Sequence, residues 1–332
     1  MIKVISNFGA LGNAVHADEP VCHEYIGDAG LLQFIRSCLS AELVILNVDQ
    51  KRLMITCLLR WLWPFSTFKL ISVDLILRPP KSTKGKLIAF IKGFLFSRVH
   101  RFILYFKDLR GYEKFYGIGS DRVVYVPFKV NGWEQIAVKP YDASSEDYVL
   151  CAGRTLRDIE TFVRAMERAG CPGVLLQQKS ELLRAHGSSA WSGELPPNLK
   201  LSVDEGNSLE SFCEVIRKAR MVVIPRFRGD IAATGISTYL VAMALQKCVV
   251  ISGGPGAEDV LSDQAVIVPP EDVNKLAEQI RLLWGDRQLR SEVASRGRKY
   301  AESLGGERRL LSDILRASLL YVHHAPPRGS RQ

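Results

Sequence analysis

The sequence predicts an α/β protein of two domains, each a parallel sheet with helices on both faces. Short, continuous apolar runs alternate with longer amphipathic segments, as expected for buried parallel strands joined by crossover helices. The 332 residues are too many for one ordinary core and suit two domains of typical size. Apolar residues make up 47% and charged residues 24%, which is the composition of a folded globular protein.

The first half begins with a short strand at residues 2–8, which leads into a turn containing Gly9 and Gly12. A glycine-bearing loop after a strand places ligand-facing backbone at the carboxyl edge of an α/β sheet. These two glycines do not complete a GxGxxG motif, so we treat them as an acceptor-loop candidate only. We then expect helices at residues 27–40 and 51–65, and strands at residues 41–49, 68–77, 98–106 and 122–128.

Residues 79–115 combine basic side chains with aromatic and aliphatic ones. Nine lysines and arginines stand between residues 81 and 114 against two carboxylates, Asp108 and Glu113. A basic, aromatic-rich helix of this kind can lie in the headgroup layer of an anionic membrane. An ordinary domain helix with solvated lysines explains the same pattern. Nucleic acid is a third interpretation, but no binding motif accompanies the charge, so we expect no nucleic acid. An anionic membrane surface, bound through residues 81–114, and an ordinary helix stay open.

The second half follows a segment without clear periodicity, residues 134–147, where we expect the domain linker. The alternation then restarts. Strands are expected at residues 148–153, 173–178, 199–204, 221–225, 247–252 and 265–270. Helices are expected at residues 159–170, 208–219, 237–246, 272–285, 287–304 and 307–324, and residues 325–332 are expected to be a disordered tail.

A polar loop at residues 226–235 connects the buried strand at residues 221–225 to the helix at residues 237–246, which the strand at residues 247–252 follows. Small and hydroxyl residues stand where this helix begins: Thr234, Gly235, Ser237 and Thr238. They leave unpaired backbone N–H groups facing outward, and such a helix end attracts phosphate. A plain crossover helix with a Thr or Ser cap explains the same residues.

The cysteines and the absence of a targeting signal indicate a cytoplasmic protein. The seven cysteines are scattered singly, without a CxxC pair or metal-ligand spacing, so we expect reduced core residues. The first residues lack the apolar core of a signal peptide, and no apolar run reaches the roughly 20 residues that span a bilayer. The formal net charge of +9 permits attraction to anionic partners.

Four segments of the second half carry a resemblance to a known family: residues 150–158 (LCAGRTLRD), 219–227 (ARMVVIPRF), 234–261 and 265–298. They resemble the C-terminal, nucleotide-sugar-binding domain of GT-B glycosyltransferases. The match is to the large retaining family, glycosyl transferases group 1, that builds polysaccharides and glycolipids. Over residues 1–138 only the order of strands and helices is similar.

The resemblance implies a fold of two Rossmann-like domains. Residues 1–138 would bind the acceptor, residues 139–305 would bind the nucleotide sugar, and the helix at residues 306–324 would pack back on the N-terminal domain. The implied activity is metal-independent transfer of a hexosyl group from a nucleotide-diphosphate sugar to a glycan or lipid-linked acceptor. The basic, aromatic segment favours a lipid-linked acceptor at the inner face of the cytoplasmic membrane. No cofactor is expected, and no DxD motif follows a strand.

The resemblance also implies which residues hold the donor. Arg154 and Arg157 follow a strand end where the family clamps the diphosphate, and an arginine can do so bidentately. The helix start at Gly235, with its neighbouring hydroxyls, would supply further donors. Alternatively, Arg154 is a surface residue and Arg157 pairs with Asp158.

The loop before that helix contains further donor-binding candidates, Arg226 and Asp230. Asp230 is able to accept hydrogen bonds from sugar hydroxyls. It would equally form a solvent-exposed pair with Arg228.

An inverting reaction needs a general base from the N-terminal domain. The candidates are His16, Asp18 and Glu19 after the first strand, and Asp49 after the second. A retaining reaction requires no such base, and these residues would then orient the acceptor.

The sequence departs from the family at the donor sugar. Two family glutamates separated by seven residues are replaced by Ala233 and Val241, and Gln246 stands where the family has Gly. The alternative function is therefore a catalytically degenerate module that binds a nucleotide or a partner protein. A nucleotide-sugar epimerase of the same fold would need more carboxylates around the donor.

Overall fold

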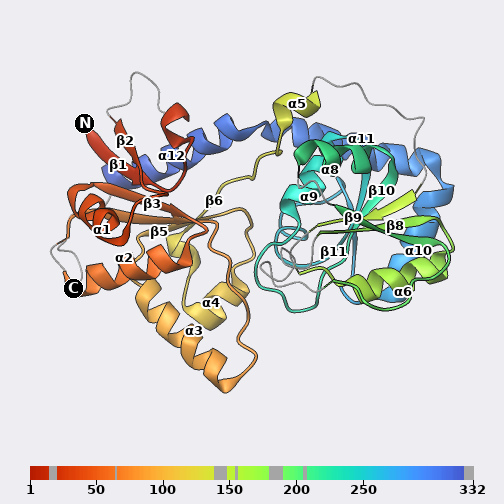
Figure 1. Cartoon of the computed structure of the whole chain (residues 1–332), viewed down its shortest axis with the longest axis horizontal. Coiled ribbons are helices and arrows are strands. Elements are labelled where there is room, and N and C mark those ends of the chain that lie inside the picture. The colour runs from red at the N-terminus through yellow and green to blue at the C-terminus, as the bar shows by residue number, and fades with distance from the viewer. Residues whose placement is uncertain are drawn as a thin grey trace. The chain divides into compact units, whose positions relative to one another are not determined.

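The computed structural model describes residues 1–14, 21–63, 66–137, 148–153, 156–178, 190–204 and 208–324 (Figure 1). The chain forms two compact units. The N-terminal unit comprises Met1–Pro127 and the chain from Arg308 onward, and the C-terminal unit comprises Phe128–Glu307. None of the helices in these described ranges is long and apolar enough to cross a membrane.

The N-terminal unit contains a parallel sheet of six strands in the order β2-β1-β3-β4-β5-β6. Its strands are β1 (Ile2–Ser6), β2 (Val21–Tyr25), β3 (Leu43–Asn47), β4 (Lys69–Val73), β5 (Arg101–Leu104) and β6 (Val123–Tyr125). The helices are η1 (Leu11–Ala14), α1 (Leu31–Ser40), α2 (Gln50–Leu62), α3 (Thr83–Phe96), α4 (Arg110–Tyr116), η2 (Ser120–Arg122) and α12 (Glu307–His324).

Strand β2 was not predicted. The segment VCHEY is an edge strand whose residues are at most partly buried, so it lacks the continuous apolar run of the inner strands. Cys22 lies on this strand and is exposed, which corrects the expectation that all seven cysteines are core residues.

The C-terminal unit contains a second parallel sheet of six strands, in the order β12-β11-β10-β7-β8-β9. The strands are β7 (Tyr148–Cys151), β8 (Gly173–Gln178), β9 (Leu199–Asp204), β10 (Ala219–Ile224), β11 (Cys248–Ser252) and β12 (Val266–Val268). The helices are α5 (Trp133–Ala137), α6 (Ile159–Ala169), α8 (Leu209–Arg217), α9 (Ile236–Ala244), α10 (Val273–Gly285) and α11 (Arg287–Leu304). This order is that of a Rossmann fold, which confirms the predicted fold class.

Both faces of the C-terminal sheet are covered, as its apolar strands predict. Along β10, Val222 and Ile224 join a core cluster with α8 and α9, while Met221 and Val223 join a second cluster with α6 and α10. The alternation follows from the two-residue period of a strand, because successive side chains point to opposite faces. The continuous apolar sequence of β10 is thereby explained.

The division between the units lies at Pro127, earlier than the expected boundary at residue 138. Val130 and Ile136 are buried in the C-terminal core cluster, so the segment around α5 belongs to that unit. Residues 138–147, most of the expected linker, lie outside the described residues.

Helix α12 returns to the N-terminal unit, as the predicted fold class requires. The ring of Tyr321 lies under the guanidinium of Arg101, 4.7 Å from the ring centre, and its centre is 5.7 Å from that of the His100 ring. Cation–ring and ring–ring contacts therefore attach the end of the chain to β5 and the residue before it.

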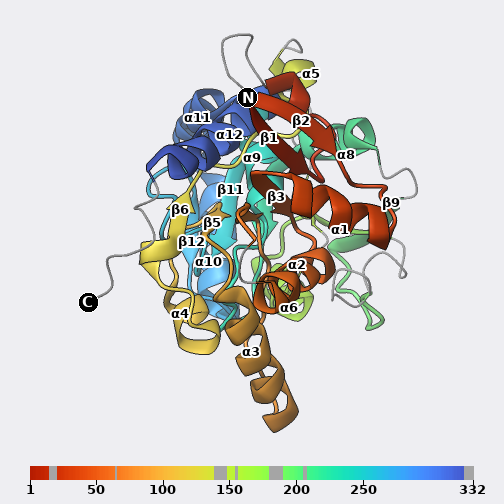
Figure 2. The same ribbon diagram turned by 90° about the vertical axis from the view of Figure 1, so that its left-hand side faces the viewer.

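Helix α3 projects from the sheet of the N-terminal unit (Figures 1 and 2). Only Ala89 and Phe96 of this helix are buried. Gly93 faces α4 so closely that a Cβ atom would lie 2.7 Å from the backbone oxygen of Tyr116. One side of α3 is thus fixed against α4, and the opposite side faces outward.

We predict that Gly93→Ala lowers the free energy of unfolding by about 1–3 kcal/mol, because the added methyl group overlaps backbone that cannot move freely. Helix propensity alone would favour alanine by about 1 kcal/mol, so the sign of the change is informative. Gly285→Ala is the control, since a Cβ atom there meets nothing within 4 Å. Urea unfolding of both variants checks this, and a stabilised Gly93→Ala would contradict the close approach.

Candidate functional site

Backbone strain marks the carboxyl edges of both sheets. Among the described residues, five that are not glycine have a positive φ. Two of them directly follow strands, Val48 (54°) after β3 and Asp74 (50°) after β4, and a third, Leu156 (49°), lies in the segment between β7 and α6. Such conformations cost about 1–3 kcal/mol each and tend to persist at functional sites. Ligand-binding groups are therefore expected at the carboxyl edges of the two sheets.

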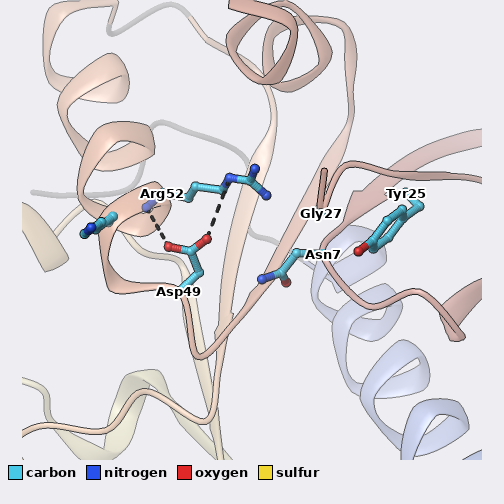
Figure 3. A pocket seen from close by; sticks show the side chains of 6 residues that line it. Asn7, Tyr25, Gly27, Asp49 and Arg52 are labelled. Atoms are coloured by element: carbon cyan, nitrogen blue, oxygen red, sulfur yellow. Dashed lines mark hydrogen bonds and ion pairs between the residues drawn. The ribbon is translucent and has the colours of Figure 1, made fainter. Parts of the chain in front are cut away.

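A pocket of about 370 Å³ lies at the carboxyl edge of the N-terminal sheet. Its lining comes from β1, β2, β3 and the segments that follow them: Asn7, Tyr25, Gly27, Asp49, Lys51 and Arg52 (Figure 3). Strand order reverses here, because β1 lies between β2 and β3. A crevice outside the strand ends at such a reversal is the usual binding site of an open α/β sheet.

Hydrogen bonds fix the polar groups of this pocket. The side-chain amide of Asn7 donates to Asn47 O (2.9 Å), and its oxygen accepts from Asn47 N–H (2.7 Å). Asp49 caps α2 by accepting from the N–H of Arg52 (2.9 Å). The guanidinium of Arg52 donates to Ile26 O (2.8 Å) and Ala29 O (2.9 Å). The pocket is consequently preorganised, with Asp49 as its carboxylate.

The two acceptor-loop glycines, Gly9 and Gly12, do not line this pocket. Gly9 lies in the turn after β1, and Gly12 lies in η1 against the ring of His23. His16, Asp18 and Glu19 lie outside the described residues. Their roles stay predictions.

Asp74, which follows β4, is a carboxylate that the sequence analysis missed. Burial raises the pKa of its carboxyl from 3.8 to about 6; the pKa of Tyr105 is also raised, mainly by burial and to a lesser extent by the charge of Asp74. A carboxylate with a pKa near neutrality is suited to accept a proton. An acidic residue at the end of an apolar run, as at Asp49, could have indicated this carboxylate. Asp74 was overlooked because we assigned the whole of residues 68–77 to one strand, whereas β4 ends at Val73.

The corresponding edge of the C-terminal sheet lies where β7 and β10 are neighbours, which is the reversal point of that sheet. Arg157 follows β7 and forms an antiparallel bridge with Arg226, which follows β10. Arg157 is buried, and its guanidinium donates to Ala152 O (3.2 Å) and to the hydroxyl of Thr238 (3.5 Å). Two strand ends and the start of α9 therefore meet at one cation.

Helix α9 begins at Ile236 without a side-chain cap within the described residues. Gly235 precedes it with a φ of 92°, and a Cβ atom there would lie 2.9 Å from Ile224 and 3.3 Å from a terminal nitrogen of Arg157. Glycine is thus required both for the backbone conformation and for the approach of the guanidinium. The first N–H groups of α9 are left without helical partners, beside the buried hydroxyl of Thr234, which has no hydrogen-bond partner in the described structure.

Two guanidiniums, those of Arg157 and Arg226, are buried near this helix end, and burial disfavours their charged forms. The pKa of Arg157 is lowered to about 10, chiefly by burial; the charge of Arg226 acts in the same direction and that of Asp230 in the opposite direction. Burial also lowers the pKa of Arg226. An anion at the start of α9 would favour both charged guanidiniums and would interact well with the helix dipole.

Arg226 is held by its own loop. Its guanidinium donates to Pro255 O (2.9 Å) and Ala232 O (3.1 Å), and only 1% of the residue is exposed. Arg226 thereby links the loop at residues 226–235 to the turn after β11, and its guanidinium adds positive charge there.

Two alternative ion pairs from the sequence analysis are wrong. Asp158 caps α6 by accepting from Thr161 N–H (3.1 Å) and does not pair with Arg157. Arg228 does not pair with Asp230 but binds Glu271, with its backbone N–H 3.0 Å from one carboxylate oxygen. Arg154 lies outside the described residues.

The two positions of the missing glutamates are packing positions. Val241 is 1% exposed inside a core cluster, and Ala233 lies against Gly256, where a Cβ atom would be 2.5 Å from that of Ala233. No group of three or more His, Cys, Asp or Glu that could hold a metal ion occurs in the described part of the chain. The site thus combines cations, backbone amides and hydroxyls, which are the groups that bind phosphates.

By sequence, no protein-family model and no curated protein matches the chain. Several solved structures match the chain in fold. HepE from Anabaena, in complex with UDP and glucose, is 13% identical with a TM-score of 0.66, over 96% of this chain and 100% of that one. Sucrose-phosphate synthase from Thermosynechococcus elongatus is 14% identical with a TM-score of 0.66, over 98% and 100%. A glycosyltransferase from Rickettsia africae is 13% identical with a TM-score of 0.65, over 97% and 90%. The chain has the fold of GT-B glycosyltransferases, which confirms the predicted resemblance.

We predict that Asp74→Asn stabilises the protein at pH 7.5 and changes its stability little at pH 4. Because the folded-state pKa (about 6) exceeds the ordinary 3.8, protonated Asp74 favours folding, and this contribution is lost as the pH rises from about 4 through 6. The two-unit difference corresponds to a gain of at most about 3 kcal/mol for the amide. Urea unfolding at both pH values measures it.

The control for this measurement is Asp108→Asn. Hydrogen bonds from Arg110 lower the pKa of Asp108, so removing this charge should destabilise the protein at pH 7.5. Equal effects of the two substitutions would mean that the Asp74 carboxyl is well solvated.

Proposed function

We propose that the chain is a metal-independent glycosyltransferase of the hexosyltransferase type. It moves a sugar from a nucleotide-diphosphate sugar to a glycan or lipid-linked acceptor in polysaccharide or glycolipid synthesis. The observation that carries the proposal is the buried cation Arg157 beneath the open N-terminus of α9, at the reversal point of the C-terminal sheet.

The chemistry follows from the charge that develops on the leaving diphosphate. The N–H groups of Ser237 and Thr238, with the positive end of α9, would stabilise it where it forms, and Arg157 and Arg154 would supply positive charge. These groups are fixed before the donor binds, so little reorganisation is needed. The donor is itself the substrate, and no further cofactor enters the proposal. UDP, present in the HepE crystal structure, is the first nucleotide to test.

The acceptor side of the proposal uses the pocket of the N-terminal unit. Asn7, Tyr25 and Asp49 offer hydrogen-bonding groups for sugar hydroxyls. An inverting reaction would use Asp49 to accept the hydroxyl proton, with His16 and Asp18 as the remaining predictions. A retaining reaction needs none of them as a base. We place the enzyme in the cytoplasm, at the inner face of the membrane.

Ser237→Asp tests the anion site by effects of opposite sign. The new carboxylate at the second position of α9 should stabilise the ligand-free protein by about 0.3–1 kcal/mol through the helix dipole. It should weaken UDP binding by at least about tenfold, because it repels a diphosphate at the same N–H groups. Thermal unfolding and calorimetry measure the two effects.

Asn274→Asp is the matched control, since it places a carboxylate at the second position of α10 in the same unit. It should leave UDP binding unchanged. Unchanged UDP binding in Ser237→Asp would remove the start of α9 from the site.

A donor screen with lipid extract as acceptor tests catalysis. We expect one nucleotide sugar to stabilise the protein and to be turned over, and Arg154→Ala to abolish turnover without unfolding. The apolar packing of Ala233 and Val241 favours the alternative, a degenerate module. Stabilisation by a nucleotide without any transfer or donor hydrolysis would establish that alternative, and no shift with any nucleotide would indicate an interaction protein.

A further inference from the structure

Helix α3 presents an apolar face to solvent. The exposed side chains are Leu87 (60%), Ile88 (44%), Phe90 (72%), Ile91 (48%) and Phe94 (52%). At about 100° per residue they occupy one side of the helix, opposite the side that packs through Ala89, Gly93 and Phe96. Isolated exposed apolar residues are ordinary, but a contiguous face of this kind marks an interaction site.

The end of α2 extends this face. Leu58, Leu62 and Trp63 are 50%, 72% and 63% exposed. Trp61 stacks on Phe94 with ring centres 4.4 Å apart, so the last turns of α2 and α3 are joined. We call the eight exposed side chains of these helices the α2–α3 surface: Leu58, Leu62, Trp63, Leu87, Ile88, Phe90, Ile91 and Phe94.

The charge around the α2–α3 surface has one sign. Between Gln50 and Lys107 the sequence contains twelve lysines and arginines and a single carboxylate, that of Asp74. Asp74 directly follows β4, and its carboxyl is desolvated. Lys81, Lys84 and Lys86, at the start of α3, are exposed and have no partner within the described residues. A partner that binds this surface must therefore present apolar groups to the exposed apolar side chains and negative charge to the lysines beside them.

The basic residues beyond α3 have other partners. Arg98 lies 3.6 Å from the centre of the Trp61 ring, and Arg110 pairs with Asp108 (2.6 Å). Lys107 lies over Tyr125. The membrane-binding segment expected at residues 81–114 thus narrows to α3 and its first lysines, together with the end of α2.

We propose that the α2–α3 surface docks on an anionic lipid bilayer, with α3 lying in the headgroup layer. Apolar side chains would enter the acyl boundary while the lysines bind lipid phosphates. A second copy of the same surface is disfavoured, since two clusters of lysines would repel each other. The proposal is independent of glycosyl transfer, and its test requires no activity.

Co-sedimentation with vesicles tests the proposal on the full chain. We expect binding to vesicles of equal parts phosphatidylcholine and phosphatidylglycerol, none to pure phosphatidylcholine, and weaker binding in high salt. Leu87→Ser with Phe90→Ser should reduce the partition coefficient by at least about tenfold. Both side chains are exposed, so thermal unfolding should not change. Leu31→Ser with Leu32→Ser is the matched control, at 57% and 73% exposure on α1.

A second pair of variants separates local charge from net charge. Lys84→Glu with Lys86→Glu should abolish binding, whereas Lys200→Glu with Lys299→Glu, exposed lysines of the C-terminal unit, should not. Three results would overturn the proposal: equal loss in both charge variants, absence of binding to the anionic vesicles, or a concentration-dependent dimer that the Leu87→Ser, Phe90→Ser variant dissociates.

Discussion

The burial of Arg157 is the constraint on which the C-terminal site depends. A guanidinium deprived of water must find acceptors, and this one uses Ala152 O and the Thr238 hydroxyl. It fits only because glycine stands on both sides: a Cβ atom at Gly153 would lie 2.3 Å from the guanidinium, and one at Gly235 would lie 3.3 Å away. The loop after β7 and the start of α9 are thereby held to the same cation. The sheet order, which makes β7 and β10 neighbours, brings these segments together.

At this site, some features follow from the local sequence, and others depend on contacts between residues that are far apart in the chain. Strands β10 and β11 and the start of α9 were predictable, because apolar runs, small residues and hydroxyls act locally. The burial of Arg157 was not, since it is set by Gly235 and Thr238, far along the chain. Arg228 was likewise assigned to a neighbour in sequence, whereas its carboxylate comes from Glu271. Asp74 was hidden because its pKa depends on surrounding side chains rather than on its own motif.

The packing of Ala233 and Val241 limits how the site recognises a ligand. With apolar side chains at both positions, recognition rests on cations, N–H groups and hydroxyls. All of these favour negative charge, and Asp230 is the carboxylate that acts electrostatically on both arginines. A diphosphate would therefore contribute more of the binding free energy than a sugar would.

Helix α2 links two features of the N-terminal unit. Its first residue follows Asp49, which lines the pocket, and its last turn belongs to the α2–α3 surface. Lys92 of α3 donates to the side chain of Gln50 (3.0 Å), so α3 is attached to the pocket end of α2 as well as to its far end. The 13 residues of α2 span ~20 Å. An acceptor whose sugar enters the pocket while its lipid stays beneath the α2–α3 surface must bridge about this distance, which a glycan or phosphate spacer between lipid and reacting sugar would do.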